Sequence, residues 1–387
     1  MRADLFCRVV DNYGDIGVCW RLARRLAHGL GWQLRLWVDD LQAFARIQPG
    51  IVPTAARQQY AGVEIVHWQD TPPAPLPQPG DVVIEAFACD PPAAFVQAMR
   101  ETRPIWVNLE YLSAEDWVPS YHALSSQRAD GLVKYFFFPG FTPDTGGLIR
   151  EPGLTAERDA LQSSRAAQTD FLRGLGLDAA LLETHRQGAR LVSLFCYPQA
   201  PAGILAQTLR QQPGPTLLLV PEGVAPGLDA QAGDGLRIVR IPFVTQPDFD
   251  RLLWCADINF VRGEDSFVRA AWAARPLVWQ IYPQDENVHL DKLEAWLARY
   301  PAPGAARDLA RAWNWESLGQ DGISHRPEAR ADLPQPPALR DALAAALAEP
   351  AWSAWRAAAR AWDAEQASGP DLADKLAIFC AKKLKTR

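Results

Sequence analysis

At 387 residues, with 48% hydrophobic and 22% charged residues, the chain has the composition of a folded protein large enough for two domains. The net charge of −6 comes without a basic stripe, which argues against a nucleic-acid partner but leaves room for a local basic pocket. No apolar run approaches the roughly 20 residues of a membrane span, and the N-terminus lacks a signal-peptide pattern. The six cysteines form no CxxC pair. We therefore expect a reduced, cytoplasmic protein with no membrane partner.

The first half of the chain alternates between apolar runs of strand length and segments with helical spacing. Residues 5–10 are predicted to form a buried first strand, and residues 18–29 carry apolar side chains on one helical face. The proline-rich segment 71–80 is predicted to be a loop, because its prolines deny it ladder hydrogen bonds. Further strands are expected at 33–38, 63–67, 81–86, 104–108 and 132–138, with a helix at 92–101.

A second alternation of the same kind follows a mixed segment, 144–184, which is predicted to hold the tail of the first domain and a linker. From residue 289 onward the chain is predicted to be helical, with a loop at 326–337. A final helix at 371–384 is expected to cross back to the first domain. The strands of the second alternation are predicted at 191–195, 216–220, 236–242, 258–261 and 277–280, with helices at 204–210, 248–255 and 266–274.

Alternating strands and helices indicate doubly wound α/β sheets, and the two alternations predict two Rossmann-like domains. We assign the first domain to residues 1–184, with the C-terminal helix 366–387 packing back on it, and the second to residues 185–365. The cleft between two such domains is where a ligand site is expected.

The turn after the first strand, residues 11–17 (DNYGDIG), combines two glycines and two carboxylates. Ligands of open α/β sheets bind at the C-terminal ends of the strands, where this turn is predicted to lie. Asp15 falls where the next helix begins, so its charge is favoured by the helix N-terminus. From the residues alone the alternative stays open that Asp15 is only an N-cap and Asp11 only a turn former.

A second acidic turn, residues 260–266 (FVRGEDS), has the same design of strand, glycine, acidic pair and helix. A helix N-terminus preceded by glycine is a ready anion site, to which Ser266 adds a hydroxyl and Arg262 a fork for a phosphate. Glu264 and Asp265 suit ribose or sugar hydroxyls. The alternative is a capped helix with Arg262 paired to Asp265 on the surface.

Aromatic residues recur at the ends of the strands in the second half: Phe195, Tyr197, Phe243 and Tyr282. A ring at such an edge can stack on a nucleobase, which contributes about 1–3 kcal/mol. Each ring by itself is more often a core residue, and only their recurrence at one edge favours a nucleotide site.

Other chemistries lack their patterns. There is no GxGxxG after the first strand and no GxxxxGK[ST], so neither dinucleotide oxidoreduction nor P-loop hydrolysis is supported. The histidines are dispersed without HExxH, which argues against a zinc site. Asp39 and Asp40 are expected to be solvated, and His289 is expected to be a surface residue near a helix start. The residues together predict a two-domain enzyme that binds a nucleotide-like ligand in the second domain and presents carboxylates from the first.

Four segments resemble a narrower family. DNYGDIGVCWRLARRL at 11–26 and PFVTQPDFDRLLWCADINFVRGEDSFVRAAWA at 242–273 resemble the EarP family, the protein-arginine rhamnosyltransferases that modify elongation factor P. FPGFTPDTGG at 138–147 and WQIYPQ at 279–284 extend the resemblance, which spans essentially the whole chain. It implies a GT-B glycosyltransferase fold.

The resemblance also implies an activity: inverting transfer of L-rhamnose from dTDP-β-L-rhamnose to an arginine side chain, with no metal ion and no cofactor. It places the essential carboxylate on Asp15, with Asp11 beside it, and Tyr13 and Gly14 in the same substrate-binding run. The donor-binding residues it implies are Phe195, Tyr197, Phe243, Gln246, Arg262, Glu264, Asp265, Ser266 and Tyr282.

Two other functions remain open from the sequence. One is a GT-B glycosyltransferase with another nucleotide sugar or another acceptor, which a panel of donors would reveal. The other is a non-catalytic nucleotide-binding module that regulates a partner, which would bind ligand without turnover.

Overall fold

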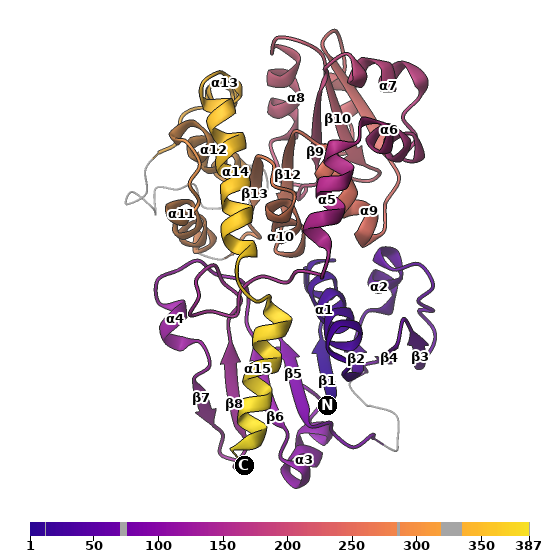
Figure 1. Ribbon diagram of the computed structural model, residues 1–387, viewed down its shortest axis with the longest axis vertical. Helices are drawn as coiled ribbons and strands as arrows, with labels where there is room; N and C mark the ends of the chain where they lie inside the picture. The colour runs from indigo at the N-terminus through magenta and orange to yellow at the C-terminus, as the bar shows by residue number, and fades with distance from the viewer. Residues whose placement is uncertain (12, 70–75, 285–286, 319–334, 387) are drawn as a thin grey trace. The chain divides into compact units, whose positions relative to one another are not determined.

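The computed structural model describes residues 1–11, 13–69, 76–284, 287–318 and 335–386 (Figure 1). The chain divides into two compact units. Unit 1 comprises Met1–Pro152 and Gln366–Arg387, and unit 2 comprises Gly153–Glu365. Each unit is built on one sheet with helices on its two faces, as the alternating sequence pattern predicts.

The sheet of unit 1 has eight strands in the order β3-β4-β2-β1-β5-β6-β8-β7. All neighbouring strands pair in parallel except for the two edge strands, β3 and β7, which pair in antiparallel fashion. The strands are β1 (Arg2–Cys7), β2 (Gln33–Val38), β3 (Arg57–Tyr60), β4 (Val63–His67), β5 (Val82–Ala86), β6 (Ile105–Leu109), β7 (Ser125–Gln127) and β8 (Val133–Phe137).

Helices pack on both faces of this sheet because its central strands are buried and apolar on both sides. On one face α3 (Ala93–Thr102) inserts Phe95 between aromatic strand residues, with its ring 4.8 Å from that of Phe6. On the other face α15 (Leu372–Lys385) lies against β6 (Figure 1). The remaining helices of unit 1 are α1 (Gly14–Arg24), its π-helical continuation Arg25–Gly29, α2 (Leu41–Ile47) and α4 (Val118–Tyr121).

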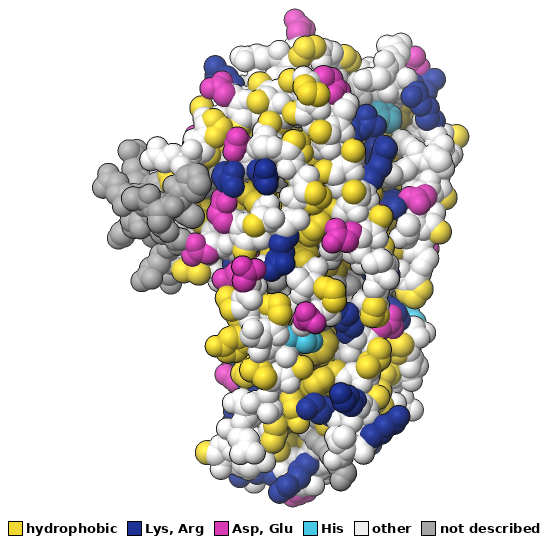
Figure 2. Space-filling model, turned by 60° about the vertical axis from the view of Figure 1, so that its left-hand side comes forward, with side chains coloured by type: hydrophobic (Ala, Val, Ile, Leu, Met, Phe, Trp, Pro, Cys, Tyr) yellow, Lys and Arg dark blue, Asp and Glu magenta, His cyan; other side chains and the backbone are white. Residues whose placement is uncertain are grey.

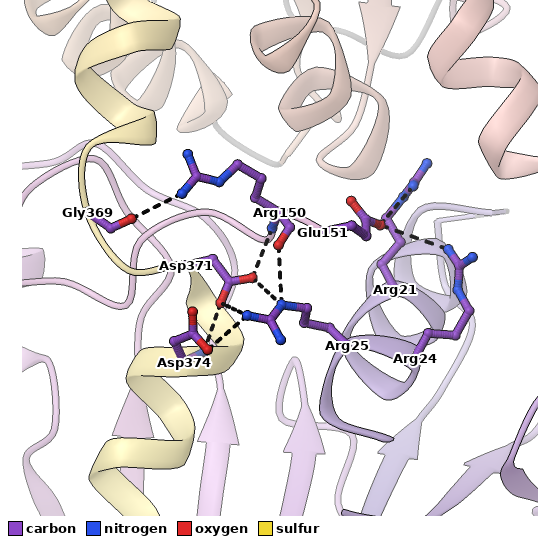
Figure 3. Close-up of polar contacts among 8 residues, drawn as sticks. All are labelled: Arg21, Arg24, Arg25, Arg150, Glu151, Gly369, Asp371 and Asp374. Atoms are coloured by element: carbon purple, nitrogen blue, oxygen red, sulfur yellow. Dashed lines mark hydrogen bonds and ion pairs between the residues drawn. The ribbon is translucent and has the colours of Figure 1, made fainter. Parts of the chain in front are cut away.

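The C-terminal segment is fastened to unit 1 by a buried cluster of charged groups (Figure 3). Arg25 donates from Nε to Asp371 Oδ2 at 2.9 Å and from Nη2 to Asp374 Oδ1 at 2.8 Å. Asp371 also caps α15, because its Oδ1 accepts the backbone N–H of Asp374 at 2.8 Å. Arg150 donates to the carbonyl oxygens of Ala367 and Gly369. Burial raises the pKa of Asp371, although the capping N–H and Arg25 oppose that shift.

Replacing Asp371 with alanine should lower the free energy of unfolding by on the order of 3 kcal/mol, because it removes the cap of α15 and a partner of the buried Arg25. Chemical denaturation followed by circular dichroism measures this. Asp374→Ala is the matched control with a smaller expected loss, since its side chain is one-third exposed and Arg25 keeps Asp371. Equal losses in the two variants would contradict the cap.

Unit 2 holds a five-stranded, all-parallel sheet in the order β11-β10-β9-β12-β13. Its strands read as near-continuous apolar runs because helices cover both faces. The strands are β9 (Arg190–Leu194), β10 (Thr216–Pro221), β11 (Leu236–Ile241), β12 (Ile258–Arg262) and β13 (Leu277–Gln280).

The helices of unit 2 divide between the two faces of its sheet. On one face Leu172, Leu182 and Leu252 pack against Leu191 and Leu217. On the other, Trp313 of α12 lies 4.8 Å from Phe260, measured between ring centroids. The helices are α5 (Leu154–Ser163), α6 (Arg165–Gly174), α7 (Ala179–Arg186), α8 (Ala202–Arg210), α9 (Gln246–Cys255), α10 (Asp265–Trp272), α11 (His289–Arg299), α12 (Gly304–Ser317), α13 (Leu339–Leu347) and α14 (Ala351–Ala367).

The division of the chain differs from the predicted boundary between residues 184 and 185, since unit 2 already begins at Gly153. The segment predicted as a tail and linker forms the helices α5, α6 and α7, which pack in unit 2. Gln162 of α5, for example, donates to the carbonyl oxygens of Trp254 and Ala273. These helices are polar on one side, which is why their sequence resembles a linker. The return of the C-terminal residues to the first unit is as predicted.

Strands β3 and β7 were not predicted, and the end of the first strand differs from its predicted position. Strands β3 and β7 are short, polar edge strands, and every residue of β7 is exposed, so neither shows apolar alternation. The first strand ends at Cys7 rather than Val10, because the N–H groups of Val9 and Val10 bond to carboxylates instead of a neighbouring strand. Half of the loop predicted at 71–80 and most of the loop predicted at 326–337 lie outside the described residues.

The surface and the cysteines bear on the compositional predictions. All six cysteines are unbridged and buried. In the described part of the chain, no helix is both long and apolar enough to cross a bilayer. On the face drawn in Figure 2, basic and acidic side chains are interspersed, and no continuous basic stripe is visible.

Candidate active-site residues

In unit 1 the DNYGDIG loop follows β1, at the point where the strand order reverses. Strand β1 pairs with β2 on one side and with β5 on the other. From β1 the chain first adds strands on the β2 side of the sheet and later adds β5 and the strands that follow on the other side. The C-terminal ends of two such strands form a crevice at which α/β proteins bind ligands. Asp11, Tyr13, Gly14 and Asp15 all lie at this point, as the sequence predicts; Asn12 lies outside the described residues.

Asp15 lies in the first turn of α1 and is only 3% exposed. Its Oδ2 accepts two hydrogen bonds, from the backbone N–H groups of Val10 and Asp11, both at 2.8 Å. It is therefore not an N-cap, which would accept from the helix itself; it holds the loop that precedes the helix. No described residue donates a hydrogen bond to Oδ1. One oxygen of Asp15 thus builds the loop, and the other accepts no hydrogen bond from the described residues.

The environment of Asp15 makes its carboxylate a stronger base than an ordinary aspartate. Burial raises its pKa most, the two backbone N–H bonds oppose this, and the nearby charges of Asp11 and Asp39 raise it further. A buried carboxylate with a raised pKa at a ligand-binding edge is a typical acid–base group.

Asp11 and Gly14 are held in close contact. The backbone N–H of Gly14 donates to the carbonyl oxygen of Asp11 at 2.6 Å, and a Cβ on Gly14 would come within 2.8 Å of Asp11 Oδ2. A larger side chain at Gly14 would displace the Asp11 carboxylate from its place over the start of α1. The hydroxyl of Tyr13 accepts a hydrogen bond from Nη1 of Arg46 at 3.0 Å, which raises the pKa of that exposed guanidinium.

Three N–H groups at the start of this loop are already used. Asp39 Oδ1 accepts the N–H of Val9 at 2.8 Å, and Asp15 takes those of Val10 and Asp11. A phosphate-binding loop of the Rossmann type keeps such groups for its ligand. The unit 1 loop is therefore built to present carboxylates, and Asp39, expected to be solvated, has a structural part in it.

In unit 2 the corresponding point lies between β9 and β12, which are neighbours although two strands separate them in the chain. Phe195 and Tyr197 follow β9, and the second acidic turn follows β12. Gly263 has a φ of +62°, a conformation that side-chain-bearing residues rarely adopt, and its carbonyl oxygen accepts from Trp279 Nε1 at 2.6 Å. The sequence prediction that both segments share one strand edge is confirmed.

Arg262 is held between two rings. Its guanidinium carbon lies 4.5 Å from the ring centroid of Phe195 and 4.7 Å from that of Tyr197, and Nη1 donates to the carbonyl oxygen of Cys196 at 3.2 Å. Cation–π contacts on this scale fix a half-buried guanidinium in place. It forms no ion pair with Asp265, so the alternative of a surface pair is wrong.

The acidic pair and the serine lie at the N-terminus of α10. Glu264 occupies the N-cap position and Asp265 the first turn. The buried hydroxyl of Ser266 accepts the N–H of Arg262 at 3.1 Å and donates to the carbonyl oxygen of the same residue. That hydroxyl therefore closes the turn in this structure. A phosphate ligand would have to compete with Arg262 for it.

The remaining predicted residues of unit 2 separate into exposed and buried ones. Phe243 is 40% and Tyr282 45% exposed, which suits ligand-facing rings. Tyr197 is buried, with its ring edge-on to Tyr282 at 5.6 Å. Gln246 is also buried, in the first turn of α9. The rings of Phe195, Tyr197 and Tyr282 thus form one aromatic wall, and Arg262 lies against the first two of them.

Sequence reasoning missed Gln280 as a residue that shapes this wall. Its Oε1 accepts the backbone N–H of Tyr197 at 2.8 Å, and its Nε2 donates to Ser317 Oγ at 3.2 Å. The signal available in the sequence was a polar amide at the end of the otherwise apolar strand LVWQ. In the structure this amide is buried, so it needs hydrogen-bond partners. Across the described residues, no group of three or more His, Cys, Asp or Glu side chains is placed to hold a metal ion.

Two doubly wound units with ligand-type loops at their strand-order reversals define a GT-B glycosyltransferase fold. Solved glycosyltransferases share it: glycosyltransferase VinC in complex with dTDP superimposes with a TM-score of 0.54 at 13% identity, covering 99% of this chain and 100% of that one. At that identity the likeness concerns the fold alone.

Closer relatives identify the family. The family model for elongation factor P rhamnosyltransferase EarP matches residues 3–381, and the chain belongs to this family. A protein-arginine rhamnosyltransferase of Pseudomonas putida is 47% identical over 98% of this chain and 99% of its own length; one of Neisseria meningitidis is 37% identical over 99% and 98%. A solved structure described as the structural basis for EarP-mediated arginine glycosylation of translation elongation factor EF-P has a TM-score of 0.63 at 34% identity, covering 98% of this chain and 99% of that one.

Proposed function

We propose that this protein transfers L-rhamnose from dTDP-β-L-rhamnose to an arginine side chain of elongation factor P, with inversion at the sugar's anomeric carbon. Membership of the EarP family supports the reaction class. The observation that carries the proposal is Asp15, a buried carboxylate with one oxygen committed to the loop and the other without a described donor. Such an oxygen suits a cationic acceptor.

A guanidinium is a poor nucleophile because it is a cation whose lone pairs are delocalised and whose pKa exceeds about 12. Asp15 would pair with one of its nitrogens and hold the positive charge on the far side of the group. That nitrogen attacks the anomeric carbon, the bond from the carbon to the diphosphate oxygen breaks, and dTDP leaves with the electron pair. Asp15 takes the proton that the nitrogen loses as the new bond forms. Asp11 would orient the acceptor.

The donor residues proposed for unit 2 match the chemistry of a nucleoside diphosphate. The exposed ring of Phe243 would stack on thymine, and Glu264 and Asp265 would accept hydrogen bonds from ribose and sugar hydroxyls. Arg262 and the N-terminus of α10 would bind the diphosphate and stabilise the charge that develops on it as it leaves. Gln246, Tyr197, Ser266 and Tyr282 complete the proposed donor site.

The pH dependence of transfer should report the raised pKa of Asp15. The base must be ionised, so kcat/KM should fall as the pH is lowered through that pKa, at a midpoint above the ordinary aspartate value of about 3.9. Asp39→Asn keeps an acceptor for Val9 but removes a charge that raises the pKa of Asp15, so it should move the midpoint to lower pH. A midpoint that does not move would contradict the assignment.

Transfer should need no metal ion, because Arg262 and the helix N-terminus are proposed to stabilise the leaving diphosphate. Activity measured after exhaustive dialysis against EDTA should equal that of untreated protein. Loss of activity that Mg²⁺ restores would contradict this proposal.

A panel of donors tests the substrate assignment. Purified protein is incubated with elongation factor P and, in separate reactions, dTDP-β-L-rhamnose, dTDP-glucose or UDP-glucose, and the acceptor's intact mass is recorded. Only dTDP-β-L-rhamnose should add a sugar, and NMR of the product should show the α-anomer. Transfer from another donor would indicate a different glycosyltransferase, and binding without any transfer would indicate a regulatory module.

A further inference from the structure

The N-terminal edge of the unit 2 sheet, opposite the end that carries Arg262, gathers arginines from separate elements. Arg190 begins β9, and Arg275 lies two residues before β13. Asp257 directly precedes β12, the strand between them, and its Oδ2 accepts the N–H of Leu191 at 2.9 Å. Adjacent strand starts therefore bring Arg190, Asp257 and Arg275 together.

Helix α14 adds two more cations to this edge. The guanidinium of Arg190 lies over the ring of Trp352, 5.7 Å from its centroid. Arg356 and Arg360 follow Trp352 at successive helical turns and so lie on the same side of α14. Burial lowers the pKa of Arg275 most; the carboxylate of Asp257 opposes this, and the charges of Arg356 and Arg360 lower it further, so all of these groups are near one another. We call Arg190, Arg275, Arg356 and Arg360 the arginine cluster.

No arginine of the cluster forms an ion pair within the part of the chain that the structure describes, although the charge of Asp257 acts on both Arg190 and Arg275. Nη1 of Arg190 and Nε of Arg275 are buried without an acceptor. The nearest acid along α14, Asp363, is paired with Arg158 at 2.7 Å. Elsewhere in this unit a buried arginine has its own partner, as Arg269 has Asp250 at 2.7 Å.

We propose that the arginine cluster is a binding site for a phosphate-bearing anion, separate from the donor site. Planar guanidinium forks bind phosphate oxygens in pairs, and buried donors without acceptors are what such a ligand would satisfy. The arginines come from the start of β9, the turn before β13 and one side of α14, and such a short cluster favours a compact, multiply charged anion over an extended polymer. The site is distinct because Asp257 and Arg262 lie at opposite ends of β12. The inference does not depend on the proposed rhamnosyl transfer.

Pyrophosphate is the probe, and the full-length Arg262→Gln protein is the background, so that the proposed donor site does not contribute. Thermal unfolding is recorded at constant ionic strength with sodium pyrophosphate replacing sodium chloride, and affinity is measured by calorimetry. The melting temperature should rise with the logarithm of the pyrophosphate concentration once this exceeds Kd. Adding Arg356→Gln or Arg275→Met should each weaken binding at least about tenfold.

A second measurement keeps the test independent of folding problems. In sodium chloride alone, Arg356→Gln and Arg360→Gln should raise the melting temperature, because each removes repulsion from Arg275. The matched control Arg251→Gln, an exposed arginine paired with Asp248, should change neither stability nor pyrophosphate binding. The proposal is overturned if pyrophosphate gives no saturable shift, if the cluster variants bind as tightly as the background protein, or if inorganic sulfate at equal concentration gives the same shift, which would indicate an adventitious ion only.

Discussion

Replacing Asp15 with asparagine should slow transfer at least about a hundredfold while leaving the fold intact. The amide oxygen can still accept the N–H groups of Val10 and Asp11, so the loop should keep its shape. The amide cannot take a proton from the acceptor nitrogen, and loss of a general base typically costs 10²- to 10⁴-fold in rate, so we expect kcat to fall by about that factor. Donor binding, assigned to unit 2, should be unchanged.

Stability distinguishes this outcome from simple unfolding. Because the pKa of Asp15 is raised in the folded state, protonation of its carboxyl favours folding. This stabilisation is fully present below the unfolded pKa and is lost as the pH rises through the folded pKa. At neutral pH the buried, ionised carboxylate therefore destabilises the folded state. The Asp15→Asn protein should melt at the same temperature as the parent or at a higher one. Asp40→Asn, which alters only the cap of α2, is the control and should stay active. Full activity in Asp15→Asn would refute the proposed role.

Replacing Arg262 with methionine should weaken binding of dTDP by about 10- to 100-fold, as expected when a charge-assisted fork to a diphosphate is lost. Methionine fills similar space beside Phe195 and Tyr197, so the aromatic wall should persist. Calorimetric titration with dTDP measures the effect directly.

Lysine at the same position separates charge from geometry. Arg262→Lys keeps the cation but loses the planar group between the two rings, so its affinity for dTDP should lie between those of the parent and Arg262→Met. The exposed Arg251→Gln should bind dTDP like the parent. If Arg262→Met bound dTDP with unchanged affinity, the diphosphate would have to be held elsewhere.

Much of the fold was predictable because its central strands carry strong local signals. The bounds of β2, β4 and β13 agree with prediction, since each carries buried apolar residues in alternating or continuous order. The edge strands β3 and β7 have no such pattern because solvent covers them. The unit boundary was displaced because α5, α6 and α7 are decided by packing on the unit 2 sheet, a long-range contact that no local pattern encodes.

For the candidate site, too, some features could be predicted from the sequence and others could not. Its proposed residues could be singled out from the sequence, because carboxylates and glycines at strand ends and a resemblance to one family both pointed to them; their position at the strand ends is what the structure shows. The details were not: Asp15 bonds backward to Val10 and Asp11, Ser266 bonds to Arg262, and Arg262 is held between two rings. These contacts depend on how neighbouring strands align. Gln280 was missed because its function is to position Tyr197 from another strand.

The most direct test of the proposed activity is the intact mass of elongation factor P after incubation with this protein and dTDP-β-L-rhamnose, followed by fragmentation of the modified peptide. We predict a gain of one deoxyhexose, located on an arginine side chain, and no gain with the Asp15→Asn protein. An unchanged mass with the parent protein, or a sugar on a residue other than arginine, would contradict the account.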